Sequence, residues 1–147
     1  DPQARPATLA LAAQYGLQDC VHESPARLRY FDALQVSLEA DANLLFGSTD
    51  LPFTPSKILS VLATGRPLLA LAPAGSAMVT RLAQLGQSCV IFPAAGSTAT
   101  ASGEAALQLR SLAAGRAGTA DLAALHRHTA AAIAARQLSV LETAATG

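Results

Sequence analysis

Residues 42–72 read ANLLFGSTDLPFTPSKILSVLATGRPLLALA, and this stretch predicts a strand, a loop, a helix and a second strand in that order. Its two ends, 42–46 and 67–72, are short apolar runs without polar alternation, which is typical of strands buried on both faces of a parallel sheet. The middle part, 55–64, has helical spacing, starts at a proline and is followed by Gly65. Two parallel strands joined through a helix require a right-handed crossover, so the stretch indicates an α/β fold.

The same alternation extends to both sides of this stretch. Strands are predicted at 20–22, 42–46, 67–72 and 88–92. Helices are predicted at 6–15, 27–40, 55–64 and 76–85. We therefore expect a doubly wound parallel sheet, Rossmann-like, with about four visible strands. Ligands of such folds bind beyond the carboxyl ends of the strands, so the loops that follow these ends are the candidate site.

The carboxyl-terminal third has a different pattern. Residues 94–103 contain only Ala, Gly, Ser and Thr, which predicts a flexible loop. Helices are predicted at 104–113 and 119–141, so that 104–147 is a helical end. A chain of 147 residues is long enough for one sizeable core, and we expect a single domain over 1–147.

Composition excludes several classes of protein. Ten Lys and Arg balance ten Asp and Glu, which argues against a nucleic-acid partner bound mainly by charge. The charge-free run between Arg81 and Glu104 is interrupted by polar residues, Pro and Gly, so no transmembrane segment is expected. Cys20 and Cys89 match no metal-ligand spacing, and no metal is expected. With no targeting segment visible, we expect a cytoplasmic protein whose two thiols are reduced and unpaired with each other.

Lys57 is the first candidate for chemistry, because it is the one lysine beside nine arginines. Thr54 is predicted to cap the following helix and Pro55 to begin it, which would place Lys57 and Ser56 in the first turn. A cation there opposes the helix dipole unless an anion binds, and free amides with an ammonium suit a phosphate. The alternative is a solvated surface lysine. No Rossmann glycine fingerprint and no P-loop is present, which argues against ordinary dinucleotide or P-loop binding.

His22 and Glu23 end the first predicted strand and form a second candidate. At that position they are able to line a ligand cleft, and the alternative is a pair of loop-facing polar groups. His126 and His128 are two residues apart on a predicted helix, a spacing that directs them to different faces. No catalytic residue is assigned.

Residues 40–78 resemble the carboxyl-terminal half of GT-B glycosyltransferases. The resemblance is carried by Ala40-Asp41 before an apolar strand, by Pro55-Ser56-Lys57 at a helix start, and by the 63–67 segment ATGRP before the next strand. It covers about 40 residues, and the order of predicted elements fits from Pro6 to Phe92. This similarity implies the nucleotide-binding half of a GT-B fold.

The resemblance implies a nucleotide-diphosphate-sugar as substrate, with no tightly bound cofactor. Thr54, Pro55, Ser56 and Lys57 would face the diphosphate, and Gly75 and Ser76 would lie near the donor sugar. The loop after Val21, with His22 and Glu23, would lie near the base. Many retaining members have two glutamates with seven residues between them, and here these positions hold Pro52 and Ser60. Ser60, at the ribose-side position, joins the candidate binding residues.

The resemblance further implies a partner domain, because the amino-terminal acceptor half of the family is absent. We expect the isolated chain to be inactive, and any membrane association to be peripheral and to run through that other half. The central first strand of the family has no counterpart before Pro6. Two alternatives stay open: a non-catalytic α/β ligand-binding or regulatory domain, and half of a sugar-nucleotide epimerase.

Overall fold

The computed structural model describes residues 7–24, 26–93, 95, 97–116 and 122–145. The chain divides into two compact units, Asp1–Ala33 and Leu34–Gly147, and each is described here by itself. Helix α2 (Tyr30–Glu39) spans the boundary between them and is shorter than the predicted helix over 27–40.

The first unit contains α1 (Ala7–Gln14), which confirms the helix predicted over 6–15. Gly16 follows it with φ 68°, a left-handed conformation that ends helices and favours glycine. The strand predicted at 20–22 is wrong, because residues 20–24 adopt no strand. The Cys20 amide instead donates to the Leu17 carbonyl at 3.0 Å in a turn. This amide is therefore not available for hydrogen bonding to a neighbouring strand.

The second unit is built on a parallel sheet of β1 (Asn43–Phe46), β2 (Leu68–Pro73) and β3 (Val90–Phe92) in the order β1-β2-β3. Leu44 lies opposite Leu69 across the first pair, and Leu71 lies opposite Val90 across the second. The α/β class and parallel pairing are therefore confirmed. The described sheet has three strands instead of the four expected, and it lacks the reversal of strand order that defines a doubly wound sheet.

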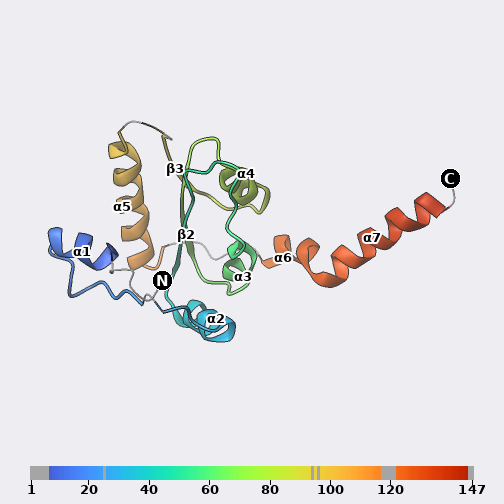
Figure 1. Ribbon diagram of the computed structural model, residues 1–147, viewed down its shortest axis with the longest axis horizontal. Helices are drawn as coiled ribbons and strands as arrows, with labels where there is room; N and C mark the ends of the chain where they lie inside the picture. Colours follow the sequence, from blue (N-terminus) through green and yellow to red (C-terminus); the bar gives the residue numbers. More distant parts are fainter. Residues whose placement is uncertain (1–6, 25, 94, 96, 117–121, 146–147) are drawn as a thin grey trace. The chain divides into compact units, whose positions relative to one another are not determined.

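Helices cover both faces of this sheet, as Figure 1 shows. The crossover helices α3 (Ile58–Leu62) and α4 (Ala77–Gln84) pack on one face, and α5 (Ala99–Ala113) packs on the other. The larger cluster of buried side chains joins both crossover helices to β2 and comprises Ile58, Leu62, Ala70, Ala72, Met78, Leu82 and Leu85. The smaller cluster joins α5 to β2 and β3 through Ala101, Leu69 and Val90.

Helix α5 begins inside the segment predicted to be a loop over 94–103. Residues 99–103 are helical, and Ala101 is buried against the sheet. Alanine has the highest helix propensity, and the Ser97 hydroxyl accepts the Ala99 amide at 3.3 Å, so the start of the helix has both a propensity and a hydrogen bond in its favour. Residues 94 and 96 of the predicted loop lie outside the described residues.

The carboxyl-terminal end is helical but interrupted. The helix predicted over 119–141 is three elements: α6 (Leu122–Leu125), the 3₁₀ turn η1 (His126–His128) and α7 (Ala130–Ala145). Thr129 breaks the run with an extended backbone at φ −67° and ψ 153°, and its hydroxyl accepts the Ala132 amide at 3.3 Å as a cap of α7. Residues 119–121 of the predicted helix lie outside the described residues.

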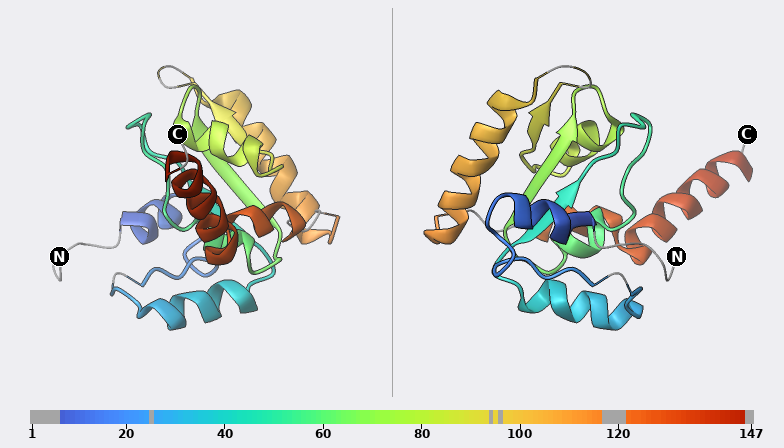
Figure 2. Two further views of the ribbon diagram at one scale, coloured as in Figure 1. Left: turned by 90° about the vertical axis from the view of Figure 1, so that its right-hand side faces the viewer. Right: turned by 60° about the vertical axis from the view of Figure 1, so that its left-hand side comes forward.

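All three strands run in the same direction, so their carboxyl ends gather at one edge of the sheet, the edge at which α5 starts (Figure 2). The loops that follow β1 and β2 leave from this edge and lead into α3 and α4. No helix of the described residues has both the length and the apolar composition needed to cross a membrane.

Candidate functional site

The carboxyl edge of β1 and β2 carries most of the predicted site residues. Gly47 continues the β1 ladder, with its amide donating to the Leu71 carbonyl at 2.7 Å. A Cβ at Gly47 would lie 2.9 Å from Ala72 Cβ and 3.0 Å from Ala72 Cα, so the backbones of the two strands approach closely at this point. The β1–α3 loop therefore leaves the sheet from a fixed position beside β2.

Lys57 lies at the start of α3, although the start differs from the prediction. The helix begins at Ile58 with Lys57 as its N-cap residue, not at Pro55 with Thr54 as the cap. The Ile58 amide donates to the Pro55 carbonyl at 3.3 Å, so residues 55–58 form a tight turn before the first full helical turn. The Lys57 carbonyl accepts the Val61 amide at 2.9 Å, while the Lys57 side chain is exposed.

The neighbouring predicted residues differ in exposure. Thr54 and Ser56 are exposed, and Pro55 is partly buried. Ser60 is partly buried, and its hydroxyl donates to the Lys57 carbonyl at 3.0 Å, a local bond within the helix. Within the described residues the Lys57 ammonium has neither an ion pair nor a hydrogen bond, so its charge is available to a ligand.

Gly75 and Ser76 form the turn between β2 and α4. The Ser76 amide donates to the Pro73 carbonyl at 3.2 Å, and Gly75 has φ 77°, a conformation that strains any residue with a Cβ. Ser76 is the N-cap residue of α4, and it is almost fully buried, with 1% of its surface exposed. Its hydroxyl makes no hydrogen bond to the described residues, which is unusual for a buried polar group.

A backbone contact that sequence analysis did not anticipate joins the two loops. The Ala77 amide, the first of α4, donates to the Leu51 carbonyl at 2.7 Å. This bond holds the middle of the β1–α3 loop against the amino-terminal end of α4. It therefore joins the loop that leads to Lys57 to the turn that carries Gly75 and Ser76.

His22 and Glu23 belong to the first unit. His22 is exposed, whereas the Glu23 carboxylate accepts the amides of Thr8 and Leu9 at 3.0 and 3.1 Å. These amides lie in the first turn of α1, where a carboxylate satisfies free donors and complements the helix dipole. The structure thus gives Glu23 a structural role at α1 that the sequence did not indicate.

The ATGRP segment has a structural role at the opposite edge of the sheet. The Arg66 guanidinium donates to the Leu38 carbonyl at 2.8 Å, in the last turn of α2. Thr64 accepts hydrogen bonds from the Asn43 amide group at 3.4 Å and the Arg66 backbone amide at 3.1 Å. The segment therefore fixes the α3–β2 turn to β1 and α2, away from the carboxyl edge where a ligand would bind.

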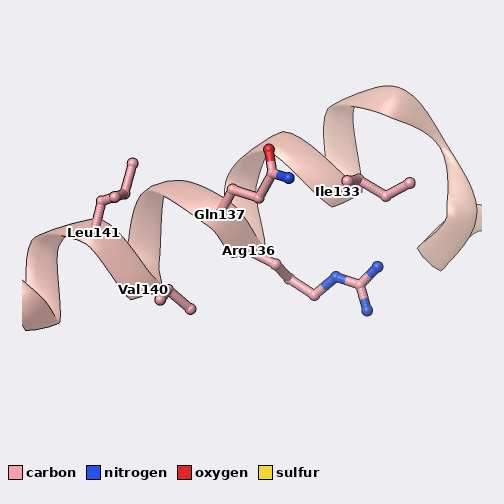
Figure 3. Close-up of a pocket in the computed structure, with 5 residues that line it drawn as sticks. All are labelled: Ile133, Arg136, Gln137, Val140 and Leu141. Atoms are coloured by element: carbon pink, nitrogen blue, oxygen red, sulfur yellow. The ribbon is translucent and has the colours of Figure 1, made fainter.

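The second unit also has two apolar hollows. One, of about 390 Å³, lies between α5 and the sheet and is lined by Leu71, Phe92, Thr98, Ala101, Ser102, Ala105, Ala106 and Leu109. The other, of about 520 Å³, lies along α7 beside Ile133, Arg136, Gln137, Val140 and Leu141 (Figure 3). Neither is lined by any of the predicted site residues.

The described residues contain no group of three or more His, Cys, Asp or Glu side chains able to hold a metal ion. Cys20 and Cys89 are both free thiols, as expected. Burial raises the pKa of the half-buried Cys89 thiol, and the nearby Glu104 charge raises it further, against a lowering by a backbone hydrogen bond from Ala72. Cys89 is therefore held in its less nucleophilic, protonated form.

Comparisons of this chain with protein-family models, with curated proteins and with solved structures found no match.

Proposed function

We propose that this chain is the donor-binding domain of a glycosyltransferase, which binds a nucleotide-diphosphate-sugar at the carboxyl edge of β1 and β2. The observation that carries the proposal is the placement of two loops side by side at this edge, joined through the Leu51–Ala77 bond at 2.7 Å. One loop leads to Lys57, whose ammonium has no partner in the described part of the chain, and the other forms the Gly75–Ser76 turn. Ligands of open parallel sheets bind at this edge.

In this proposal, Lys57 and the polar groups of Thr54, Ser56 and Ser60 contact the diphosphate and its ribose. A compact ammonium suits a phosphate, and it would stabilise the negative charge that develops on the diphosphate as it leaves. Gly75 and Ser76 lie on the side of the sugar. The acceptor and any general base belong to a further domain, and the complete enzyme acts in the cytoplasm.

Direct binding of nucleoside diphosphates tests the proposal. Isothermal titration of the chain with UDP, GDP and ADP is expected to give saturable binding of at least one of them, with the nucleoside alone binding more weakly. Inorganic sulfate at the same ionic strength serves as the control for unspecific anion binding. Absence of binding by all three diphosphates would refute the proposed function.

A non-catalytic ligand-binding domain is the second candidate. Pro52 and Ser60 occupy the two positions at which many retaining GT-B enzymes carry glutamates, and this observation favours it. A protein that joins this chain to the proposed acceptor domain distinguishes a glycosyltransferase from a non-catalytic domain. It is assayed with nucleotide-sugars as donors and with water or simple sugars as acceptors. Binding without release of the nucleoside diphosphate would favour the non-catalytic domain.

A further inference from the structure

The amino-terminal end of α4 contains a buried hydroxyl, that of Ser76, without a hydrogen-bond partner among the described residues. As the N-cap residue, Ser76 has φ −73° and ψ 149°, the extended backbone from which a serine hydroxyl normally accepts an amide of the first turn. The Ser76 side chain makes no such bond, although only 1% of the residue is exposed. Leaving a buried hydroxyl unpaired destabilises a protein, so this arrangement requires a reason.

The backbone amides beside this hydroxyl are occupied by carbonyl groups of the chain itself. The Ala77 amide donates to the Leu51 carbonyl at 2.7 Å, and the Val79 amide donates to the Ser76 carbonyl at 3.1 Å. The Leu51 carbonyl thus presents a partially negative oxygen to the positive end of α4, which is the position an anionic oxygen of a ligand would take. Leu51 belongs to the β1–α3 loop, not to α4, and a loop displacement would release the Ala77 donor.

We propose that the Ala77 amide and the Ser76 hydroxyl form an anion-binding position at the end of α4, which the Leu51 carbonyl occupies while no ligand is bound. The ligand is an anionic oxygen, of a phosphate or of a sugar carboxylate, and it displaces the carbonyl and takes the hydroxyl as a second donor. The inference rests on the proposed function for the source of the anion, and it concerns residues other than Lys57. In this inference, the β1–α3 loop covers the anion position while no ligand is bound and moves away when the anion binds.

The exchange of partners at the Ala77 amide tests this inference directly. In the isotope-labelled chain, the scalar coupling across the Leu51–Ala77 hydrogen bond is expected to be present without ligand. It is expected to disappear, with a shift of the Ala77 amide resonance, on saturation with pyrophosphate or glucuronate. Glucose is the neutral control, and the two anions distinguish a phosphate from a carboxylate source. A coupling that persists in the presence of both saturating anions would overturn the inference.

Ser76→Ala provides a second, independent measurement. If the hydroxyl is unpaired without ligand, its removal leaves the melting temperature unchanged or higher, whereas loss of a true serine cap would lower it. Affinity for the active anion is expected to fall roughly tenfold, as for the loss of one hydrogen bond to a charged group. Ser88→Ala, at an exposed serine in the α4–β3 connection, is the matched control and changes neither quantity. A lower melting temperature or an unchanged affinity for Ser76→Ala contradicts the inference.

The diphosphate titration and the Ala77 amide resonance together separate this inference from the proposed function. If a nucleoside diphosphate binds and Lys57→Ala weakens it while the Ala77 amide does not respond, the end of α4 is not an anion site and the proposed function stands. If no diphosphate binds but pyrophosphate shifts the Ala77 amide, the anion position stands and the glycosyltransferase proposal fails.

Discussion

Lys57 is the only lysine of the chain, and its exposed ammonium makes no ion pair with the described residues. We predict that Lys57→Ala weakens binding of the nucleoside diphosphate by about one to two decades, because a charge-assisted contact to phosphate contributes roughly 1.5–3 kcal/mol. Lys57→Arg restores the affinity only in part, since a planar guanidinium does not replace a compact ammonium. Calorimetric titration measures both variants.

The melting temperature distinguishes a binding role of Lys57 from a structural one. Lys57 contributes its backbone, not its side chain, to the start of α3, so Lys57→Ala is expected to unfold at the same temperature as the native chain. Arg116→Ala, at another exposed cation, is the control for a general loss of positive charge. Equal diphosphate affinities of Lys57→Ala and the native chain would make Lys57 an ordinary surface residue.

The fold changes the proton affinity of the His128 imidazole. Its pKa is lowered, first by desolvation and then by the positive charges of Arg81, Arg127 and Arg136. The Arg81 guanidinium lies 3.3 Å from His128 Nδ1, a contact that needs the neutral imidazole as acceptor. The folded chain therefore binds this proton less readily than the unfolded chain, whose histidine has an ordinary pKa of about 6.5.

We predict that acidification weakens the contact between η1 and α4. As the pH falls through about 6.5, the imidazole of the unfolded chain takes up a proton before that of the folded chain does. The contribution of neutral His128 to the free energy of unfolding is therefore fully present above that pH and is lost as the pH falls through the folded pKa. An NMR titration of the His128 ring measures the pKa. Arg81→Gln is expected to raise it partway, because desolvation remains. A His128 pKa at or above 6.5 in the native chain contradicts the prediction.

At the scale of elements, the close approach of the β1 end to β2 depends on Gly47. We predict that Gly47→Ala lowers the free energy of unfolding by about 1–3 kcal/mol, because the new methyl would lie 2.9 Å from Ala72 Cβ and 3.0 Å from its Cα. Gly103→Ala is the matched control, since a Cβ there meets no atom within 4 Å inside α5. It should stabilise the chain by about 0.5–1 kcal/mol. Denaturant unfolding measures the free energy of unfolding of both variants. Equal changes for Gly47→Ala and Gly103→Ala would contradict the claim that β1 and β2 approach too closely at Gly47 for a side chain.

The elements that sequence predicts well are those whose signals are local. The apolar runs at 42–46, 67–72 and 88–92 become β1, β2 and β3, because a strand buried on both faces needs a continuous apolar run. Helix α4 lies within the predicted 76–85, and Gly86 follows it with φ 69°. In these segments, the local sequence favours the same secondary structure that the parallel sheet requires.

The predictions that failed depend on partners distant in the sequence or on turns of only a few residues. The run at 20–22 resembles a strand, yet Cys20 is held in a turn and Glu23 is engaged by the amides of α1, fifteen and fourteen residues away. Thr54 and Pro55 have the residue types of a helix start, but a turn at 55–58 delays α3. The bond between Leu51 and Ala77 involves backbone atoms alone, and no residue type in the sequence marks it.

At the scale of the whole molecule, burial is concentrated in the sheet and its crossover helices. Leu69, Ala70 and Ala72 of β2 are almost fully buried, and β2 is hydrogen-bonded on both edges. By contrast, α2 and α7 have no buried residue among those described. A helix that buries no side chain depends on its own propensity, and isolated helices shorter than about 12–15 residues are marginal in water. Helix α2 has 10 residues and α7 has 16, so neither is much longer than this limit.

We therefore predict an uneven pattern of amide hydrogen exchange. The amides of β2 are expected to exchange only on global unfolding, because opening this strand exposes both faces of the sheet at once. The amides of α7 are expected to exchange orders of magnitude faster, despite its seven alanines within Ala130–Ala145, since none of its side chains is buried. Mass spectrometry of the exchanging chain resolves the two segments. Protection of α7 equal to that of β2 would contradict the prediction, and would mean that the apolar side chains Ile133, Val140 and Leu141 are covered in solution.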